Sequence, residues 1–152
     1  MRDTVVRVQS LGPTENVVVV RFVGTPVAIS QGQILSQYLA NGADDEVCVL
    51  TANLPFGGVA AESYTVDDVA RTGLVKVYRG AGVICNAKVS ASSQAVVVGD
   101  QLIPDVSEAG LKAVNFAGAA TGIAAIALEA YPTGSAANMK VMLTGQYSAC
   151  IA

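Results

Sequence analysis

The segment Met139-Lys140-Val141-Met142-Leu143-Thr144 carries the alternation that decides the fold class of this chain. Every second residue from Met139 is apolar, so these side chains would share one face of an extended strand, opposite Lys140 and Thr144. The same period of two occurs in Leu74–Arg79, where valines flank Lys76. An alternation of this kind is typical of half-buried β-strands.

Valine-rich runs bounded by Gly, Pro, Asn and Asp recur along the rest of the chain, as they do in all-β domains. The further candidate strands are Thr4–Gln9, Val17–Val23, Glu46–Leu50, Gly82–Lys88, Leu111–Phe116 and Ile123–Ala130. The first two flank a turn-forming segment, Leu11–Asn16, and predict an N-terminal hairpin or arm over residues 1–24. The sequence therefore predicts a mainly β fold, a compact antiparallel β-sandwich or barrel-like domain.

Two short helices are expected within this β pattern. Ser30 and Gln33 resemble a capping box, the apolar residues that follow them fit a helical stripe, and Gly42 suits a left-handed cap. These features predict a helix over about residues 31–41. A second helix over about residues 65–72 is predicted because Thr65 can cap it and Gly73 can end it.

A weak internal repeat is visible. Gly58-Val59-Ala60-Ala61-Glu62 is echoed by Ala125-Ile126-Ala127-Leu128-Glu129, and each segment leads to a Lys-Val step, Lys76-Val77 or Lys140-Val141. The repeat predicts two similar strand–loop–strand units that pack on one core over residues 57–145. The 152 residues are expected to form a single domain, 1–152.

Composition excludes several classes of function. Apolar residues make up 52% of the chain and charged residues 14%, against about 25% charged in an average domain. The net charge of −3 with no basic cluster argues against nucleic-acid binding. Histidine is absent, and with it the commonest general base and metal ligand.

Neither a membrane span nor a targeting segment is predicted. The longest uncharged stretch near the C-terminus, Ala113–Leu128, is shorter than the ~20 residues that a spanning helix needs. Near the N-terminus, Arg21 interrupts the apolar run Val17–Val20, so no signal-peptide core forms. We therefore expect no membrane partner.

The three cysteines, Cys48, Cys85 and Cys150, are widely spaced and do not form a disulfide framework. No Cys-x-x-Cys pair occurs, which argues against zinc. Cys48 and Cys85 lie in apolar runs and are expected to be buried free thiols. An intermolecular disulfide through Cys150 stays open.

The acidic clusters do not predict a catalytic pair. Asp44-Asp45-Glu46 and Asp67-Asp68 are adjacent residues, and adjacent residues of a strand point to opposite faces. Both clusters are interpreted as solvated segments, and cation binding by residues 44–46 is a less favoured alternative. Gly80-Ala81-Gly82 lacks the spacing of a phosphate-binding loop, and Gly57-Gly58 is interpreted as a loop or bulge entering a strand.

The remaining candidates for chemistry are few. Arg71 and Arg79 are interpreted as exposed ion-pair or interface charges. The tyrosines at 64, 78, 131 and 147 are interpreted as packing or interface residues. No catalytic residue, cofactor-binding residue, metal ligand or cofactor is predicted, and the protein is expected not to be an enzyme. A small hydrolase that uses only carboxylates is the enzymatic alternative.

Four segments of the second half occur in a distinctive order. They are Val96–Leu102 with its Gly-Asp-x-Leu step, Glu108–Val114, Gly122–Ala130 and Met139–Gly145. This order resembles the decoration, or head cement, proteins of tailed bacteriophages, and the likeness covers roughly residues 57–145. The N-terminal half matches less well, and the helix expected at 31–41 departs from the pattern.

The resemblance implies a non-enzymatic virion protein that binds the exterior of an assembled capsid and stabilises it. It implies the major capsid protein lattice as partner, a homotrimer, and synthesis in the host cytoplasm. The apolar tail Ser148–Ala152 is a candidate self-contact, and Met1–Ser10 is a candidate arm that adds a strand to a neighbour. The alternative is a β-rich adhesin or carbohydrate-binding module of a virion or cell surface.

Overall fold

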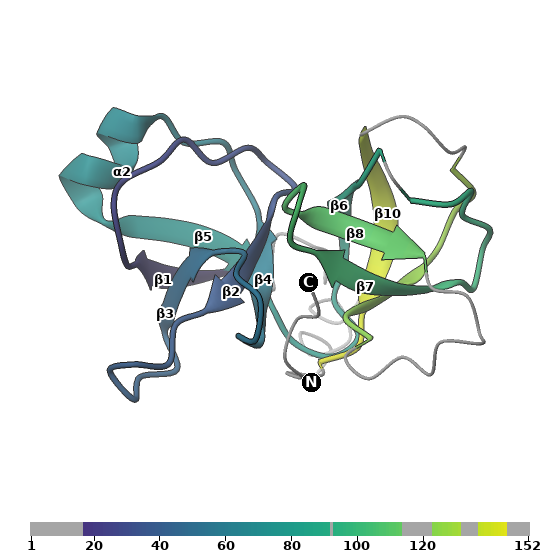
Figure 1. Cartoon of the computed structure of the whole chain (residues 1–152), viewed down its shortest axis with the longest axis horizontal. Helices are drawn as coiled ribbons and strands as arrows, with labels where there is room; N and C mark the ends of the chain where they lie inside the picture. The colour runs from purple at the N-terminus through teal and green to yellow at the C-terminus, as the bar shows by residue number, and fades with distance from the viewer. Residues whose placement is uncertain (1–16, 92, 114–122, 132–136, 146–152) are drawn as a thin grey trace, which may run out of the picture.

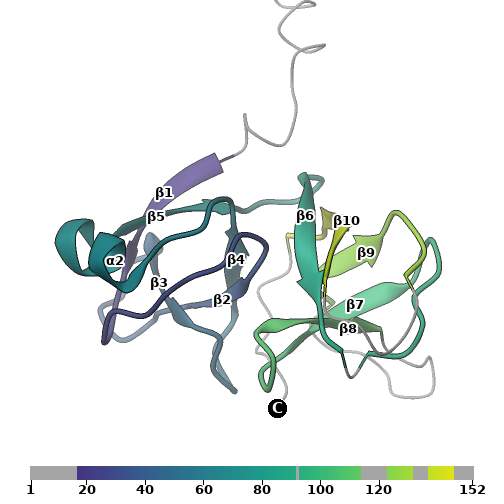
Figure 2. The same cartoon turned by 90° about the horizontal axis from the view of Figure 1, so that it is seen from above.

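The computed structural model describes residues 17–91, 93–113, 123–131 and 137–145 (Figure 1). Over these residues the chain forms ten strands and one helix, arranged as two closed five-stranded barrels. The barrels lie side by side in both views (Figures 1 and 2). The mainly β, barrel-like fold class predicted from the sequence is confirmed.

The first barrel contains β1 to β5. Their bounds are β1 Val17–Phe22, β2 Ile34–Gln37, β3 Glu46–Val49, β4 Phe56–Ala60 and β5 Leu74–Tyr78. The strands neighbour one another in the order β1-β3-β2-β4-β5, and β5 closes the barrel on β1. The β1–β3 pair is parallel, and the other four pairs are antiparallel.

The second barrel repeats this topology strand for strand. Its strands are β6 Ile84–Val89, β7 Gln101–Asp105, β8 Gly110–Ala113, β9 Ala125–Ala127 and β10 Ala137–Leu143. Their order is β10-β6-β8-β7-β9, with β6–β8 parallel and the other pairs antiparallel. Strands β6 to β10 therefore correspond to β1 to β5 in chain order.

The two segments of the sequence repeat occupy matching places in the two barrels. Ala60 of β4 is paired with Val77 of β5, and Ala127 of β9 is paired with Val141 of β10. The repeat extends beyond these strands, because an isolated bridge joins Ile29 to Tyr64 in one barrel and Val96 to Tyr131 in the other. The duplicated unit is thus a whole barrel.

Each barrel has its own apolar interior, and the alternating segments supply it. Val75 and Val77 of β5 are buried in the first cluster. The second cluster contains the alternate residues of β10, which are Met139, Val141 and Leu143. The predicted alternation of both strands is confirmed. The expected single domain over 1–152 stays a prediction. Within the described residues, the structure has two apolar interiors, one in each barrel.

The second apolar cluster extends across the boundary between the barrels. Ile34 and Val59, on β2 and β4 of the first barrel, belong to it and are fully buried. Backbone hydrogen bonds also cross this boundary: Ile34 N donates to Ala109 O at 3.0 Å, and Lys88 N donates to Gly32 O at 2.8 Å. The outer face of β2 and β4 is therefore covered by the second barrel.

The helix predicted over about 65–72 is confirmed as α2, Val66–Thr72. Thr65 caps it, because its side chain accepts from Asp68 N while the Asp68 carboxylate accepts from Thr65 N. Gly73 ends it at φ 65°, the left-handed conformation that glycine adopts without strain. Asp67 and Asp68 lie in the first turn, where negative charge complements the helix dipole.

The helix predicted over about 31–41 is wrong. The Ser30–Gln33 pair does form, with Ser30 N donating to Gln33 Oε1 at 3.0 Å, but it closes a tight turn that leads into β2. The apolar Ile34 and Leu35 are both buried because β2 is covered on both faces, with Leu35 inside its barrel and Ile34 against the neighbouring one. Burial on both faces removes the alternation by which a strand is recognised.

Strands β2 and β7 were not predicted as strands. The repeat predicted a strand from about Gly58, and β4 confirms it with a start two residues earlier; all five residues of β4 are buried, so its sequence does not alternate. Pro104 lies within β7 and weakens the strand signal there. The other predicted strands within the described residues coincide with observed strands, to within a few residues at their ends.

Several predictions lie outside the described residues. These are the strand at 4–9 and its turn, the arm Met1–Ser10, the tail Ser148–Ala152, Cys150 and Tyr147.

Candidate functional site

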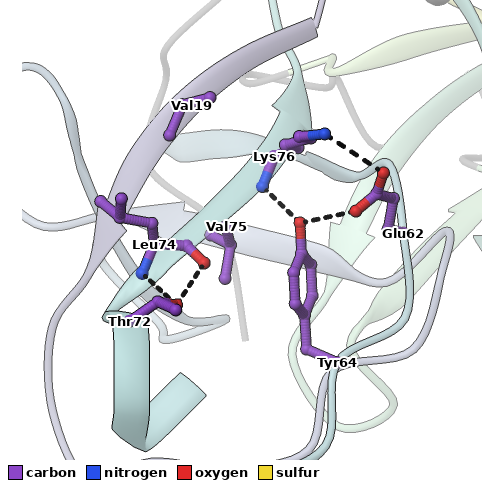
Figure 3. A pocket seen from close by; sticks show the side chains of 7 residues that line it. All are labelled: Val19, Glu62, Tyr64, Thr72, Leu74, Val75 and Lys76. Atoms are coloured by element: carbon purple, nitrogen blue, oxygen red, sulfur yellow. Dashed lines mark hydrogen bonds and ion pairs between the residues drawn. The ribbon is translucent and has the colours of Figure 1, made fainter. Parts of the chain in front are cut away.

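A surface hollow of about 310 Å³ lies on the first barrel, beside β1, β5 and the end of α2 (Figure 3). Its lining consists of Val19, Glu62, Tyr64, Thr72, Leu74, Val75 and Lys76. Val19 and Leu74 are 53% and 48% exposed, which is high for apolar side chains of this size. The hollow is thus a largely apolar depression at the outer face of the β1–β5 pair.

The polar groups around the hollow bond to one another. Lys76 N donates to Tyr64 Oη at 2.8 Å, and Tyr64 Oη donates to Glu62 Oε2 at 3.3 Å. Lys76 Nζ lies 3.4 Å from Glu62 Oε1. Figure 3 shows the Tyr64 hydroxyl between Lys76 of β5 and Glu62, at the centre of this network. These contacts hold the walls of the hollow together.

Tyr64 is not poised for proton transfer near neutral pH. Burial raises its pKa above the ordinary tyrosine value, the hydrogen bond from Lys76 N opposes this, and the Glu62 charge adds to the rise. The phenol is therefore neutral and acts as a hydrogen-bonding group. The hollow offers apolar contact rather than acid–base chemistry.

The acidic clusters have structural roles. Asp44 and Asp45 are exposed, as the solvated interpretation predicted, and their backbone carbonyls accept from Arg79 Nη1 at 2.7 Å and Arg21 N at 2.8 Å. Glu46 departs from that interpretation: it is only 5% exposed, and Asn41 Nδ2 donates to its Oε1 at 3.0 Å. The side chains do not converge on one point.

Asp67 and Asp68 are used by α2. Two hydrogen bonds that involve Thr65 lower the pKa of Asp68 below its usual value, and the nearby Arg71 charge lowers it further. Arg71 Nη2 lies 3.2 Å from Asp68 Oδ1, which confirms the exposed ion-pair role expected for that arginine. This pair stabilises the helix start and presents no acid to a substrate.

Arg79 has a different role from the exposed charge that was expected. It is half-buried, and its Nε donates to Gly57 O at 2.8 Å. Together with the bond to Asp44 O, this contact ties β4 to the loop before β3. Gly57-Gly58 lies within β4, and the β2–β4 register shifts between Leu35 and Ser36, opposite this pair. The bulge interpretation of the two glycines is confirmed.

Cys48 and Cys85 are free and buried, as predicted. Burial raises the pKa of the Cys85 thiol to about 12, and burial raises that of Cys48 despite a hydrogen bond with Thr51. Both thiols are therefore un-ionised at neutral pH, and a thiol in that state is a poor nucleophile and a poor metal ligand.

Over the described ranges, no group of three or more His, Cys, Asp or Glu side chains is arranged to hold a metal ion. Within the same ranges, no helix has the length and apolar character that crossing a bilayer requires.

No site residue was predicted from the sequence, and of the residues that line the hollow only Tyr64 was singled out, as a packing or interface residue. A signal was nevertheless present in the repeat. Tyr64 and Tyr131 are 67 positions apart, as are Glu62 and Glu129, and both pairs occupy matching places in the two barrels. Comparing the two barrels position by position identifies where one half carries exposed apolar residues and the other does not.

The chain matches no protein-family model, and no curated protein is significantly similar to it. Among solved structures, the crystal structure of the head fiber gp8.5 N base in bacteriophage phi29 is similar, with a TM-score of 0.51 and 16% sequence identity. The likeness covers 86% of this chain and 95% of that chain. At this level of identity it shows that the two chains share a fold.

Proposed function

We propose that this protein is a structural component of a tailed-phage virion that binds the exterior of the assembled capsid and stabilises it. The observation that carries the proposal is the fold likeness to the head fiber base of phage phi29, which spans both barrels rather than one. Fold alone does not define function, and features of this chain's own sequence and surface support the same assignment.

The resemblance to decoration proteins supports the same assignment. Two of its four segments contain β8 and β9, Met139–Gly145 contains most of β10, and Val96–Leu102 leads into β7. The segments therefore supply four of the five strands of one closed barrel. The four segments therefore belong to one folded unit and are not scattered over the molecule.

The ionisable side chains support a non-enzymatic role. Asp68 caps a helix, Glu46 is buried against Asn41, and Arg79 ties β4 to the loop before β3. Catalytic acids and bases are held in a cleft with their reactive atoms free to meet a substrate. In this protein these groups stabilise the fold itself.

In the proposed mechanism, each bound copy adds its own contribution to the stability of the shell. A subunit that bridges neighbouring capsomers must lose its own interface before they separate, so each bound copy raises the free energy needed to open the shell. A homotrimer would engage several lattice positions at once and gain from multivalency. The partners under this proposal are the major capsid protein lattice and further copies of this chain.

Co-sedimentation with phage heads tests the proposal. The purified full chain is mixed with expanded, undecorated heads of its phage and, separately, with unexpanded proheads. We expect saturable pelleting with expanded heads at a fixed number of copies per head. The absence of co-sedimentation at concentrations well above micromolar would contradict the proposal.

A further inference from the structure

Because the two barrels are equivalent, each surface that takes part in the contact between them has an equivalent surface on the other barrel. These equivalent surfaces lie at the two ends of the molecule. In Figure 1, β2 and β4 of the first barrel face the second barrel, whereas β1 and α2 lie on the far side. The second barrel turns β6 and β8 toward the first and keeps β7 and β9 away from it (Figure 2). The equivalent of the β2 and β4 side is therefore uncovered on the second barrel, and the equivalent of the β6 side is uncovered on the first barrel. These two uncovered faces lie at opposite ends of the molecule.

The internal contact is centred on a turn of the first barrel. Gly32 is buried there, and Gln31 O accepts from Asn138 Nδ2 of the second barrel at 3.1 Å. A Cβ on Gly32 would overlap the Asn138 side chain, so the two barrels are in close contact at this point. Lys88 N completes the contact through its hydrogen bond to Gly32 O.

The same turn exists in the second barrel. Gly99 corresponds to Gly32, because Gly99 N donates to Ala127 O at 2.8 Å just as Gly32 N donates to Ala60 O at 2.8 Å. The Asp100 carboxylate accepts from Val97 N as the Gln33 side chain accepts from Ser30 N.

This second turn is uncovered and apolar. Val97 and Val98 take the places of Ser30 and Gln31 and are 58% and 66% exposed. We call Val97, Val98, Gly99 and the half-buried Ile126 the β7–β9 face.

The surface that would receive such a turn also has an uncovered counterpart. Asn138 stands opposite Lys88 in the β10–β6 pair, and Leu74 stands opposite Arg21 in the β5–β1 pair. Leu74 therefore occupies the place of Asn138, and it lines the apolar hollow together with Val19. We call Val19, Arg21, Leu74 and Lys76 the β1–β5 face.

Both uncovered faces carry an apolar residue where the internal contact has a polar one. Inside the chain Asn138 Nδ2 donates to the backbone carbonyl of Gln31. At the ends of the molecule the corresponding residues are Val98 and Leu74, and both are apolar and exposed. Leu74 cannot donate the hydrogen bond that Asn138 makes, so the equivalent contact between two copies would join apolar side chains, and each face alone exposes apolar area to water at a cost.

We propose that the β7–β9 face of one copy docks on the β1–β5 face of a second copy, head to tail, and repeats between copies the contact that joins the two barrels. The occupant of the hollow is thus the Val97–Gly99 turn of another copy. Arg21 N is already bonded to Asp45 O, so the contact rests on apolar side chains instead of the backbone bond seen at Lys88. Contacts of this heterologous kind close into rings or extend into filaments.

Engineered cysteines test the contact directly. Leu74→Cys and Val98→Cys are introduced together in a full-length chain that also carries Cys150→Ser, since Cys48 and Cys85 are buried and un-ionised. Mild oxidation is expected to produce disulfide-linked multimers from the double variant, as one discrete species for a ring or a ladder for a filament. Each single-cysteine variant is expected to stay uncrosslinked or to form slow random dimers.

The outcomes separate the alternatives. Rapid dimers from Leu74→Cys alone would indicate a symmetric contact and would overturn the head-to-tail arrangement. A double variant that remains monomeric would also overturn it. If crosslinking appears only after residues 1–16 are deleted, the hollow is occupied by the chain's own N-terminal segment, and the proposal is wrong for the intact chain.

A charge-exchange experiment provides a second readout by sedimentation velocity. Leu74→Glu and Val98→Lys are each expected to weaken self-association by roughly tenfold or more, because each places a charge in an apolar contact and the lysine would also face Arg21 and Lys76. The double variant is expected to recover at least part of the loss through a Lys–Glu pair. Val49→Lys is the matched control, an apolar residue 42% exposed that belongs to neither face, and it should leave association unchanged.

This self-contact does not require capsid binding. Crosslinking in free solution therefore tests it independently of the head-binding experiment, and either result can fail without the other.

Discussion

Tyr64 and Glu129 accept the same hydrogen bond in the two halves of the molecule. Tyr64 Oη accepts from Lys76 N at 2.8 Å, and Glu129 Oε1 accepts from Lys140 N at 2.9 Å. Lys76 and Lys140 occupy matching positions on β5 and β10. Equivalent backbone N–H groups in the two barrels are thus satisfied by a phenol in one and by a carboxylate from a non-equivalent position in the other. This indicates that the barrel requires the bond.

Removing either acceptor should destabilise its barrel by a similar amount. We expect Tyr64→Phe and Glu129→Ala each to lower the free energy of unfolding by about 1 kcal/mol, because a backbone N–H loses its protein partner. Urea unfolding followed by circular dichroism measures both. Glu62→Ala is the control, since both side chains of its pair with Lys76 are at least half exposed, and it should cost less than either. Equal losses for all three would contradict this account.

Gly57 is expected to tolerate no side chain. A Cβ there would lie 2.5 Å from Gln37 N and from the carbonyl carbon of Ser36, both backbone atoms of β2. Gly57→Ala should therefore cost roughly 3 kcal/mol or more, or prevent folding.

Gly42→Ala is the control for that variant. Gly42 has a positive φ of 71°, but a Cβ there would have open space, so only backbone strain of about 1 kcal/mol is expected. Thermal unfolding of both variants gives the comparison, and a smaller loss at Gly57 than at Gly42 would show that the close approach is not rigid.

Strands with one buried face and one exposed face could be predicted from the sequence, as could a helix with capping residues at both ends. Half-buried β5 and β10 alternate, and Thr65 and Gly73 mark both ends of α2, so local chemistry identified all three. The wrong helix at 31–41 arose where β2 is buried on both faces by a tertiary contact. No local pattern encodes that contact, because it depends on a second barrel that begins only at Ile84.

The hollow and the uncovered faces were not predictable from local motifs either. Their signal lies in a comparison between the halves, where Gln31 and Asn138 are replaced by Val98 and Leu74. That comparison requires the strand correspondence, which the short repeat around Glu62 and Glu129 indicates only in part.

The α2 cap offers a local test of stability. Thr65→Ala removes the side-chain acceptor for Asp68 N and should lower the free energy of unfolding by about 1 kcal/mol. Thr72→Ala, at the other end of the helix, provides the comparison, because its hydroxyl bonds to Asp68 O and Leu74 O without capping the N-terminus. Chemical unfolding measures both, and a larger effect at Thr72 would contradict the capping role.

The buried Cys85 thiol predicts how stability changes with alkaline pH. An unfolded thiol loses its proton near pH 9, whereas the folded thiol holds it until about pH 12. The stabilisation is therefore complete below pH 9 and is lost as the pH rises toward 12. Over this window the free energy of unfolding should fall by up to about 1.4 kcal/mol per pH unit from this group.

Cys85→Ala isolates that contribution. The variant is less stable at every pH because it leaves a small cavity, but its stability should fall less steeply between pH 9 and pH 11 than that of the native chain. Urea unfolding at pH 7, 9, 10 and 11 gives both slopes. Parallel curves would show that Cys85 ionises freely in the folded protein.

The central claim, that bound copies stabilise a phage capsid, is tested most directly by the temperature at which heads release their DNA. Expanded, DNA-filled heads that lack this protein are titrated with the purified chain, and release is followed by the fluorescence of a DNA-binding dye during heating. We predict that the release temperature rises with occupancy and levels off when the sites are saturated. An unchanged release temperature at saturating occupancy would contradict the claim.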